Sequence, residues 1–263
     1  MIGLLFGDTD LPKQILKKIK KNNVKYFIID LSKKKSFKKD PLSHSIKIGQ
    51  FGKIFKIFKI NKCNKVLLAG KINKPKFSSL KMDFKGFYYL PRIIKAAKLG
   101  DAAILSAIIT ILSKEKIKVI SSIAYNPELT LSRGIYTKVK PNKEDIISIR
   151  KGIESLGKLS PYNHTQGLVI KRNKVISKET SKGTKKMLLL IAKNKKSKGI
   201  LIKFPKKKQD LRLDLPTVGL DTLKDCKKAG IKGIVLKSKK NIFMDKSKSI
   251  RFANKNKIFI KVL

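Results

Sequence analysis

Near its start the chain reads Ile2-Gly-Leu-Leu-Phe-Gly-Asp-Thr-Asp-Leu-Pro12. The apolar run over residues 2–6 predicts a buried strand. The polar turn that follows leads into a helix running to about residue 21, because Pro12 suits the first turn of a helix. A second apolar run, Tyr26-Phe-Ile-Ile-Asp30, predicts another strand. The chain therefore opens strand–helix–strand, which is the unit of parallel sheets covered by helices.

The same alternation continues through the first half of the chain. The elements predicted after residue 30 are a helix near 50–60, a strand at 66–70, helices at about 91–98 and 102–114, and a strand near 117–123. Residues 1–132 are thus expected to form a Rossmann-like domain with a parallel sheet. Ligands of such sheets bind beyond the carboxyl ends of the strands. Here that edge would carry Gly7–Asp10 and Gly70–Lys74.

The second half of the chain predicts a different arrangement. A polar segment from Ser132 to Lys143 lacks an apolar period and marks a boundary, with the second domain at residues 133–263. Its predicted elements are helices at about 143–157, 185–192 and 246–255, a helix ending at 229–230, and strands at 167–171, 174–177, 200–204, 234–236 and 258–262. We expect a mixed α/β domain here, and an α/β fold class for the whole chain.

The charge is strongly unbalanced. The chain has 263 residues, with 64 Lys and Arg against 17 Asp and Glu, and a formal net charge of +47. Such charge is typical of nucleic-acid binding when it is clustered. Here Lys is spread along the whole chain and only six basic residues are Arg, the better partner for phosphates and bases. A compositional bias that solvates the surface is favoured, over attraction to anionic ligands or membranes and over nucleic-acid binding.

Several classes of protein are excluded or unsupported. Cys63 and Cys226 fit neither a disulfide framework nor a metal or redox spacing. The longest apolar stretch, residues 102–112, is interrupted by polar side chains and is shorter than the roughly 20 residues of a membrane span. The first residues do not resemble a signal peptide. We therefore expect a cytoplasmic protein.

Acids are rare in this chain, so a cluster of them is informative. The segment Asp210-Leu-Arg-Leu-Asp-Leu-Pro-Thr-Val-Gly219 carries two acids and an Arg. In an extended segment Arg212 and Asp214 would point to the same side, and Pro216-Thr217 resembles the start of the next helix. A carboxylate there could hold Mg²⁺ or position water against a phosphate. The alternative is a salt bridge with a helix cap.

Other candidates rest on weaker signals. Gly183-Thr184 opens a predicted helix whose amides could bind phosphate, or it is a simple cap. Lys203, at the end of a strand, is a candidate phosphate partner. Asp101 is a candidate site residue, but its position after Gly100 fits an N-cap equally well. The helix near 50–60 could lie on an anionic membrane, although packing against its own sheet is favoured. Asp221 and Asp225 indicate a solvated helix face.

Several short motifs occur in an order that resembles a known family. They are Phe51-Gly-Lys-Ile-Phe-Lys56, Leu68-Ala-Gly70 followed by Pro75 and Phe77, Gly100-Asp101, Thr130-Leu with Arg133-Gly134, Gln166-Gly167, Gly183-Thr184 with Met187, and Arg212-Leu-Asp-Leu-Pro-Thr-Val-Gly219. Together they resemble the two-domain UDP-2,3-diacylglucosamine pyrophosphatases of lipid A biosynthesis. The resemblance covers essentially the whole chain.

The resemblance implies a Mg²⁺-dependent hydrolase that cleaves UDP-2,3-diacylglucosamine to UMP and 2,3-diacylglucosamine 1-phosphate. It implies that Asp214 is the essential catalytic and metal-binding aspartate, with Arg212 beside it. The substrate-binding residues expected on this basis are Gly7, Asp8, Gly70, Lys71, Asp101, Gln166, Gly183, Thr184, Lys203 and Thr217. The chain departs from the family where Lys76, Lys182 and Lys185 replace acids. The acids that would compensate are Asp8, Asp10 and Glu179.

The resemblance also sets expectations about partners. The two acyl chains of the substrate need an apolar groove, expected between the two halves. Phe84, Phe87, Tyr88 and Tyr89 are candidates to line it, although core packing is favoured for aromatic residues so close together. A lipid substrate would bring the basic protein to the anionic inner leaflet of the membrane. The alternative function is an RNA- or ribosome-associated binding protein without catalysis; no nucleic acid is expected under the favoured hypothesis.

Overall fold

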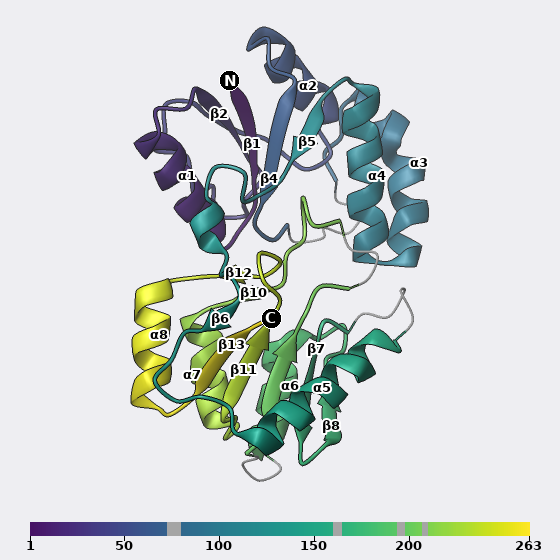
Figure 1. Cartoon of the computed structure of the whole chain (residues 1–263). Helices are drawn as coiled ribbons and strands as arrows, with labels where there is room; N and C mark the ends of the chain where they lie inside the picture. Colours follow the sequence, from purple (N-terminus) through teal and green to yellow (C-terminus); the bar gives the residue numbers. More distant parts are fainter. Residues whose placement is uncertain (73–79, 160–164, 194–197, 207–209) are drawn as a thin grey trace. The chain divides into compact units, whose positions relative to one another are not determined.

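A computed structural model of the protein describes residues 1–72, 80–159, 165–193, 198–206 and 210–263. Its internal contacts divide the chain into two compact units, Met1–Pro127 and Glu128–Leu263. The sequence had placed the boundary after residue 132. Each unit is built around its own sheet with helices packed on it (Figure 1), which confirms the predicted α/β class.

The first unit contains a parallel sheet. Its strands are β1 (Ile2–Phe6), β2 (Tyr26–Asp30), β3 (Ser43–Ser45), β4 (Lys65–Ala69) and β5 (Lys118–Ile120). Its helices are α1 (Leu11–Lys21), α2 (Phe51–Ile60), α3 (Phe84–Leu99) and α4 (Asp101–Lys114). Among the described residues the strand order is β3-β2-β1-β4-β5, and every neighbouring pair is parallel. The carboxyl ends of all these strands therefore lie at one edge of the sheet.

Helix α2 packs into the core of this unit, as the favoured interpretation of its sequence predicted. Its apolar stripe, Ile54, Phe55 and Phe58, is buried. The ring of Phe58 meets that of Phe27 on β2 edge-on, with centroids 5.0 Å apart. Gly3 on β1 makes room for this ring, because a Cβ there would lie 2.4 Å from it. The apolar face of α2 is thus occupied by its own sheet, through Phe58, and by α3, through the contact of Phe55 with Tyr89.

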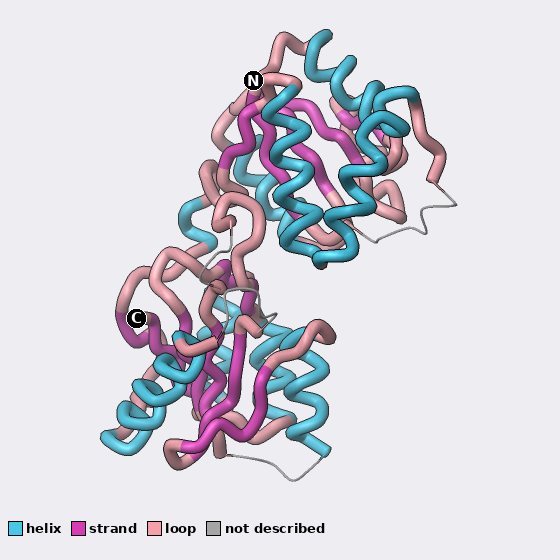
Figure 2. Tube along the Cα trace, turned by 90° about the vertical axis from the view of Figure 1, so that its right-hand side faces the viewer, coloured by secondary structure: helices cyan, strands magenta, loops and turns pink. Residues whose placement is uncertain are grey.

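Helices α3 and α4 pack against each other and lie in front of the sheet in Figure 2. Helix α3 begins at Phe84, seven residues earlier than predicted, because Asp83 caps it. The carboxylate of Asp83 accepts hydrogen bonds from the Gly86 N–H at 2.9 Å and from the Lys53 N–H of α2 at 3.0 Å. The sequence placed Pro91 in the first turn, whereas it lies inside the helix on its exposed side.

The second unit contains a mixed sheet. Its strands are β6 (Gly134–Ile135), β7 (Gly167–Lys171), β8 (Lys174–Lys178), β9 (Ile200–Lys203), β11 (Gly233–Leu236) and β13 (Phe259–Val262), with β10 (Thr217–Val218) and β12 (Ile242–Phe243) as a separate pair. Its helices are α5 (Lys143–Gly157), α6 (Gly183–Lys193), α7 (Leu220–Lys228) and α8 (Lys246–Lys255), and the short 3₁₀ helix η2 (Pro127–Leu129) spans the boundary between the units. Among the described residues β9, β11 and β13 run parallel to one another. Strand β6 pairs antiparallel with β13, and β7 pairs antiparallel with both β8 and β9.

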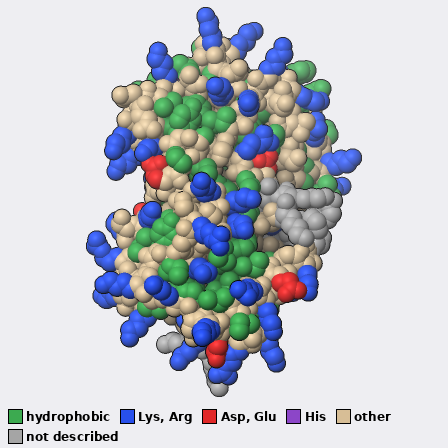
Figure 3. Space-filling view, in the orientation of Figure 1, with side chains coloured by type: hydrophobic (Ala, Val, Ile, Leu, Met, Phe, Trp, Pro, Cys, Tyr) green, Lys and Arg blue, Asp and Glu red, His purple; other side chains and the backbone are tan. Residues whose placement is uncertain are grey.

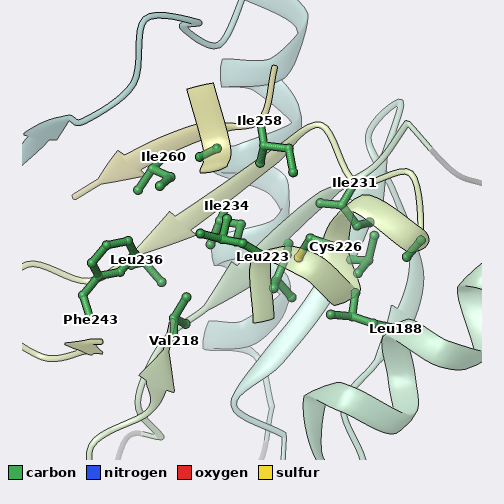
Figure 4. Packing of buried hydrophobic residues seen from close by; sticks show 14 of the residues in the cluster. Leu188, Val218, Leu223, Cys226, Ile231, Ile234, Leu236, Phe243, Ile258 and Ile260 are labelled. Carbon is green, nitrogen blue, oxygen red and sulfur yellow. The ribbon is translucent and has the colours of Figure 1, made fainter. Parts of the chain in front are cut away.

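The core of the second unit brings helices and strands together. In Figure 4, Leu188 of α6, Leu223 and Cys226 of α7 and Ile234 of β11 converge, and each is at most 1% exposed. Full burial of one such aliphatic side chain contributes roughly 1.5–3 kcal/mol before the entropy of ordering is subtracted. The thiol of Cys226 is free, as is that of the buried Cys63 in the first unit.

Among the helices in the described parts of the chain, none has the length and apolar character needed to cross a bilayer.

Candidate active site

The first group of predicted site residues gathers at the carboxyl ends of β1 and β4. The Asp8 N–H donates to the Lys71 carbonyl at 2.8 Å, and the Lys71 N–H donates back to the Asp8 carbonyl at 2.8 Å. Glycines are needed on both sides of this crossing. A Cβ on Gly7 would lie 2.5 Å from the Lys71 oxygen, and one on Gly70, whose φ is +89°, would lie 2.5 Å from the Asp8 oxygen. The structure thus brings all four predicted residues together.

The acids near this crossing differ in their surroundings. The carboxylate of Asp8 accepts a hydrogen bond from the Lys33 N–H at 3.4 Å. That of Asp10 is exposed and pairs with Lys13 at 3.0 Å. The backbone of Asp101 begins α4 directly after Gly100, so Gly100, and not Asp101, occupies the N-cap position. The predicted positions Pro75, Lys76 and Phe77 lie outside the described residues.

The second group lies at the carboxyl end of β9 and centres on a buried ion pair. The Nζ of Lys203 lies 3.2 Å from both carboxylate oxygens of Glu179, and the two side chains are 6% and 9% exposed. Thr184, in the first turn of α6, completes the network. Its hydroxyl donates to Glu179 Oε1 at 2.9 Å and accepts from Lys203 Nζ. The network ties β9, the residue after β8, and the start of α6 to one another.

Backbone contacts extend this group to other predicted residues. The Gln166 carbonyl accepts a hydrogen bond from the Phe204 N–H at 2.8 Å. The buried Asn241 side chain donates to the Lys203 carbonyl at 3.0 Å and to the Pro216 carbonyl at 3.4 Å. Asn241 thereby joins the end of β9 to the loop that carries Asp214. Gly183, with φ +80°, is the first residue of α6, so the prediction that this pair opens a helix is confirmed.

The Asp214 loop differs from the predicted extended segment. Residues 211–213 form a turn in which the N–H groups of Leu213 and Asp214 both donate to the Asp210 carbonyl at 3.1 Å. Alternation of side chains applies to strands and not to such a turn, so the sequence gives no reason for Arg212 and Asp214 to share a side. Arg212 instead forms a bidentate salt bridge with Asp210, with Nε–Oδ1 at 3.0 Å and Nη2–Oδ2 at 2.7 Å.

The pairing with Arg212 has an electrostatic consequence. Its guanidinium, by hydrogen bonding, lowers the pKa of the Asp210 carboxyl, and burial only partly opposes this effect. Arg212 is therefore held in place by an acid that stays ionised. Its exposed position leaves it able to approach an anionic ligand.

The prediction that Pro216-Thr217 starts a helix is wrong. Thr217 and Val218 form β10, which pairs in parallel with Ile242 and Phe243 of β12. Helix α7 begins only at Leu220, after Gly219. Because Thr217 is in a strand, the loop that carries Asp214 leads into β10 and not into a helix. Asp214 itself is half-buried in that loop. The exposed Thr217 donates its hydroxyl to the Leu215 carbonyl at 3.2 Å.

Two residues of the second group were not among the predicted site residues. The sequence indicates Glu179 only as a compensating acid, because it is a rare acid directly after a predicted strand. Asn241 stands between lysines and a short apolar pair, where nothing in the sequence distinguishes it. By contrast Asp221 is 96% exposed on its side chain and pairs with Lys224, as its solvated interpretation predicted.

The donor chemistry of the second unit fits a Mg²⁺ ion held by few protein ligands. Within the described residues no group of three His, Cys, Asp or Glu side chains lies at metal-binding distances. Mg²⁺ commonly takes one or two carboxylates, with water and substrate phosphates completing its shell. Glu179 is engaged by Lys203 and Asp210 by Arg212. Asp214, which the sequence motif predicts as the metal ligand, lies half-buried in this same loop.

Comparison with known proteins agrees with this arrangement of two units. The model of the LpxI N-terminal domain matches residues 1–129, and that of the LpxI C-terminal domain matches residues 132–261. The chain is 30% identical to UDP-2,3-diacylglucosamine pyrophosphatase LpxI of Caulobacter vibrioides over 271 aligned positions. The alignment covers 98% of this chain and 96% of that relative. The resemblance inferred from the motifs is confirmed, and the chain belongs to the LpxI family.

Proposed function

We propose that this protein hydrolyses the pyrophosphate bond of UDP-2,3-diacylglucosamine in lipid A biosynthesis, in a Mg²⁺-dependent reaction that gives UMP and 2,3-diacylglucosamine 1-phosphate. The observation that carries the proposal is the match to a pyrophosphatase of this specificity along 98% of the chain. We also propose that the reaction takes place in the cytoplasm.

The residues of the second unit supply what cleavage of a pyrophosphate requires. The substrate is an anion, so its phosphates need positive charge and N–H donors. Arg212 offers an exposed guanidinium, and the amides at the start of α6, near Gly183 and Thr184, form the positive end of a helix dipole. When bound, Mg²⁺ would neutralise phosphate charge and lower the pKa of a water. Asp214 is the residue that we expect to hold the ion.

The buried pair beside this loop supports the site by positioning it. Lys203 and Glu179 neutralise each other and hold Thr184, so the first turn of α6 is fixed relative to β9. Asn241 fixes the Asp214 loop to the same strand end. In the first unit, two backbone hydrogen bonds join the Gly7–Asp8 and Gly70–Lys71 loops at the carboxyl edge of the sheet. Parallel sheets bind ligands at such an edge, and we expect it to contact the nucleotide sugar.

The proposal is tested by measuring UMP release from UDP-2,3-diacylglucosamine with Mg²⁺ and with EDTA. We expect wild-type turnover to require the metal, and the variant Asp214→Ala to lose at least a thousandfold in kcat. The matched control is Asp221→Ala, which removes an exposed acid and is expected to keep wild-type turnover. Circular dichroism of each variant checks that it is folded.

Other outcomes of this experiment are informative. Full turnover by Asp214→Ala would keep the substrate but remove Asp214 from the site. Wild-type turnover in EDTA would contradict the metal dependence. Absence of turnover in the wild type would contradict the proposed activity, and salt-dependent RNA binding would then be measured.

A further inference from the structure

Helix α3 carries aromatic side chains on the surface of the protein. Phe84 is 87% exposed, Phe87 is 61% exposed and Tyr88 is 67% exposed. The sequence favoured core packing for these aromatics, but only Tyr89, which is 6% exposed, is buried. The cause is the helical rotation of about 100° per residue, which places Tyr89 on the buried side while Phe84, Phe87 and Tyr88 share the opposite side. Exposure of three large aromatic rings on one helix is costly in water and indicates a surface that meets an apolar partner.

The exposed positions form one continuous face. Successive residues of a helix are rotated by about 100°, so positions spaced by three and four residues lie above one another. The exposed residues Phe84, Phe87, Tyr88, Pro91, Arg92, Lys95, Lys98 and Leu99 follow this spacing along the whole helix. The opposite side carries the buried Gly86, Tyr89 and Ala96. We call the exposed side the α3 face; its first turn is aromatic, its later turns are basic, and it ends on a leucine.

The charge on the α3 face has one sign. The helix contains no Asp or Glu, so nothing on the helix itself neutralises Arg92, Lys95 and Lys98. Asp83, directly before it, is occupied by backbone N–H groups, and Glu115, packed beside it, accepts hydrogen bonds from Lys85 and Tyr89. Lys and Arg side chains also dominate the visible charged surface of the protein in Figure 3. The partner must therefore combine apolar groups with negative charge.

We propose that the α3 face docks this protein onto the surface of an anionic lipid bilayer. Aromatic rings partition into the boundary between headgroups and acyl chains, where Tyr also keeps its hydroxyl in a polar layer. Lys and Arg on the same helix then lie at the level of the lipid phosphates and are attracted by the surface potential. The helix is about 24 Å long, so rings at one end and cations along the rest engage the surface together.

Charge and shape both favour a bilayer over other apolar partners. A second copy of this chain would bring another surface rich in Lys and Arg against the α3 face, with no acid on α3 to neutralise it. Its net charge of +47 would add further repulsion. A pocket for single acyl chains is concave, whereas an exposed helix face is convex. Helix α2, the other candidate considered from the sequence, has its apolar stripe buried in the core.

The test measures binding of the full-length protein to vesicles without any substrate, so its result does not depend on the proposed catalysis. Vesicles of phosphatidylglycerol and phosphatidylcholine in equal amounts are compared with phosphatidylcholine alone, by co-sedimentation. The variant Phe84→Ser/Phe87→Ser/Tyr88→Ser is expected to lose at least tenfold in partition coefficient on the anionic vesicles. The matched control, Ile60→Ser/Ile147→Ser/Leu190→Ser, removes three other exposed apolar side chains and is expected to stay within twofold of wild type.

A second pair of variants tests the charged part of the face. Arg92→Gln/Lys95→Gln/Lys98→Gln is expected to weaken anionic binding at least fivefold. Lys227→Gln/Lys228→Gln/Lys248→Gln, which removes as much charge from exposed sites elsewhere, is expected to weaken it less than twofold.

Three results would overturn the proposal. They are wild-type binding by the aromatic variant, equal binding of the wild type to neutral and anionic vesicles, and absence of wild-type binding to either. The first would assign binding to overall charge, and the second would assign it to apolar adsorption.

Discussion

The ion pair between Lys203 and Glu179 is an unusual feature in a protein with so few acids. Both charges are almost fully removed from water, which is costly for each ion. Two contacts between Lys203 Nζ and the carboxylate oxygens, with the Thr184 hydroxyl bound to both side chains, offset that cost. The pair therefore stabilises the unit only as long as both members are present.

We expect Lys203→Met and Glu179→Met, made singly, each to lower the free energy of unfolding by about 3–5 kcal/mol, because each leaves one buried charge without its partner. The double variant should lose clearly less than the sum, since no charge is then left buried. Urea denaturation followed by circular dichroism measures all three. Additive losses would show that the two charges do not stabilise each other.

At the residue scale the sequence predicted that the residues of the two loops at the sheet edge lie close together. It did not predict the side-chain hydrogen bonds that the site residues form. Gly7, Asp8, Gly70 and Lys71 were placed together by the rule that parallel strands end at one edge, and the structure brings them together. The pairing of Arg212 with Asp210 was missed because the segment turns, and a single turn leaves no periodic signal. Asn241 was missed because its partners, the carbonyls of Lys203 and Pro216, are distant in sequence.

Among the elements, α3 depends most clearly on one side chain. Asp83 both caps α3 and accepts a hydrogen bond from the first turn of α2. Burial raises the pKa of this carboxyl, but the N–H groups of Gly52, Gly86 and Lys53 outweigh burial and lower it overall. One carboxylate thus fixes the starts of two helices relative to each other.

We expect Asp83→Ala to lower the free energy of unfolding of the first unit by about 1–2 kcal/mol, as loss of an N-cap does. Asp83→Asn should lose less, because Asn caps helices about as well as Asp. The ionised Asp83 is stabilising above its unfolded pKa, and this contribution is lost as the pH falls through its lower, folded pKa. The difference in free energy of unfolding between wild type and Asp83→Asn should therefore become smaller below about pH 4.

Urea denaturation at pH 7 and at several values from pH 5 to pH 3 checks both parts of this prediction. Asp10→Ala is the control, because it removes an exposed acid paired only with a surface lysine. A difference that grows toward low pH would contradict the ionised cap.

The elements that the sequence predicted well are those with a strong local signal. The buried strands β1, β2, β4 and β9 and the helices α1, α5 and α8 have apolar runs or periods of their own. The strands β10 and β12 have two residues each, and they exist only because Thr217 and Val218 meet Ile242 and Phe243. Such pairing is a tertiary event, and no window of sequence contains it.

For the whole molecule the dominant physical fact is the net charge of +47. Like charges spread over a surface repel one another and oppose the compact state. Salt screens this repulsion, because the Debye length falls from about 30 Å at 0.01 M to below about 10 Å above 0.1 M.

We expect the melting temperature to rise by about 4 °C or more between 20 mM and 500 mM NaCl, which corresponds to a gain of roughly 2 kcal/mol or more for a protein of this size. Scanning calorimetry measures the shift, and the control is an uncharged osmolyte, such as sucrose, at equal osmolality. A melting temperature that stays constant or falls with salt would show that repulsion among the lysines does not destabilise the folded state.

The two buried cysteines give each unit its own chemical reporter. Cys63 lies in the first unit and Cys226 in the second, and burial raises the pKa of the Cys226 thiol so that little reactive thiolate forms. An alkylating reagent therefore reaches the fully buried Cys226 only when the second unit opens, and it reaches Cys63, which is 8% exposed, mainly when the residues packed around it in the first unit separate. Mass spectrometry of the two peptides, after brief exposure to iodoacetamide, would read the opening rate of each half of one chain separately. No label or engineered residue is needed to learn whether the halves unfold together or in turn.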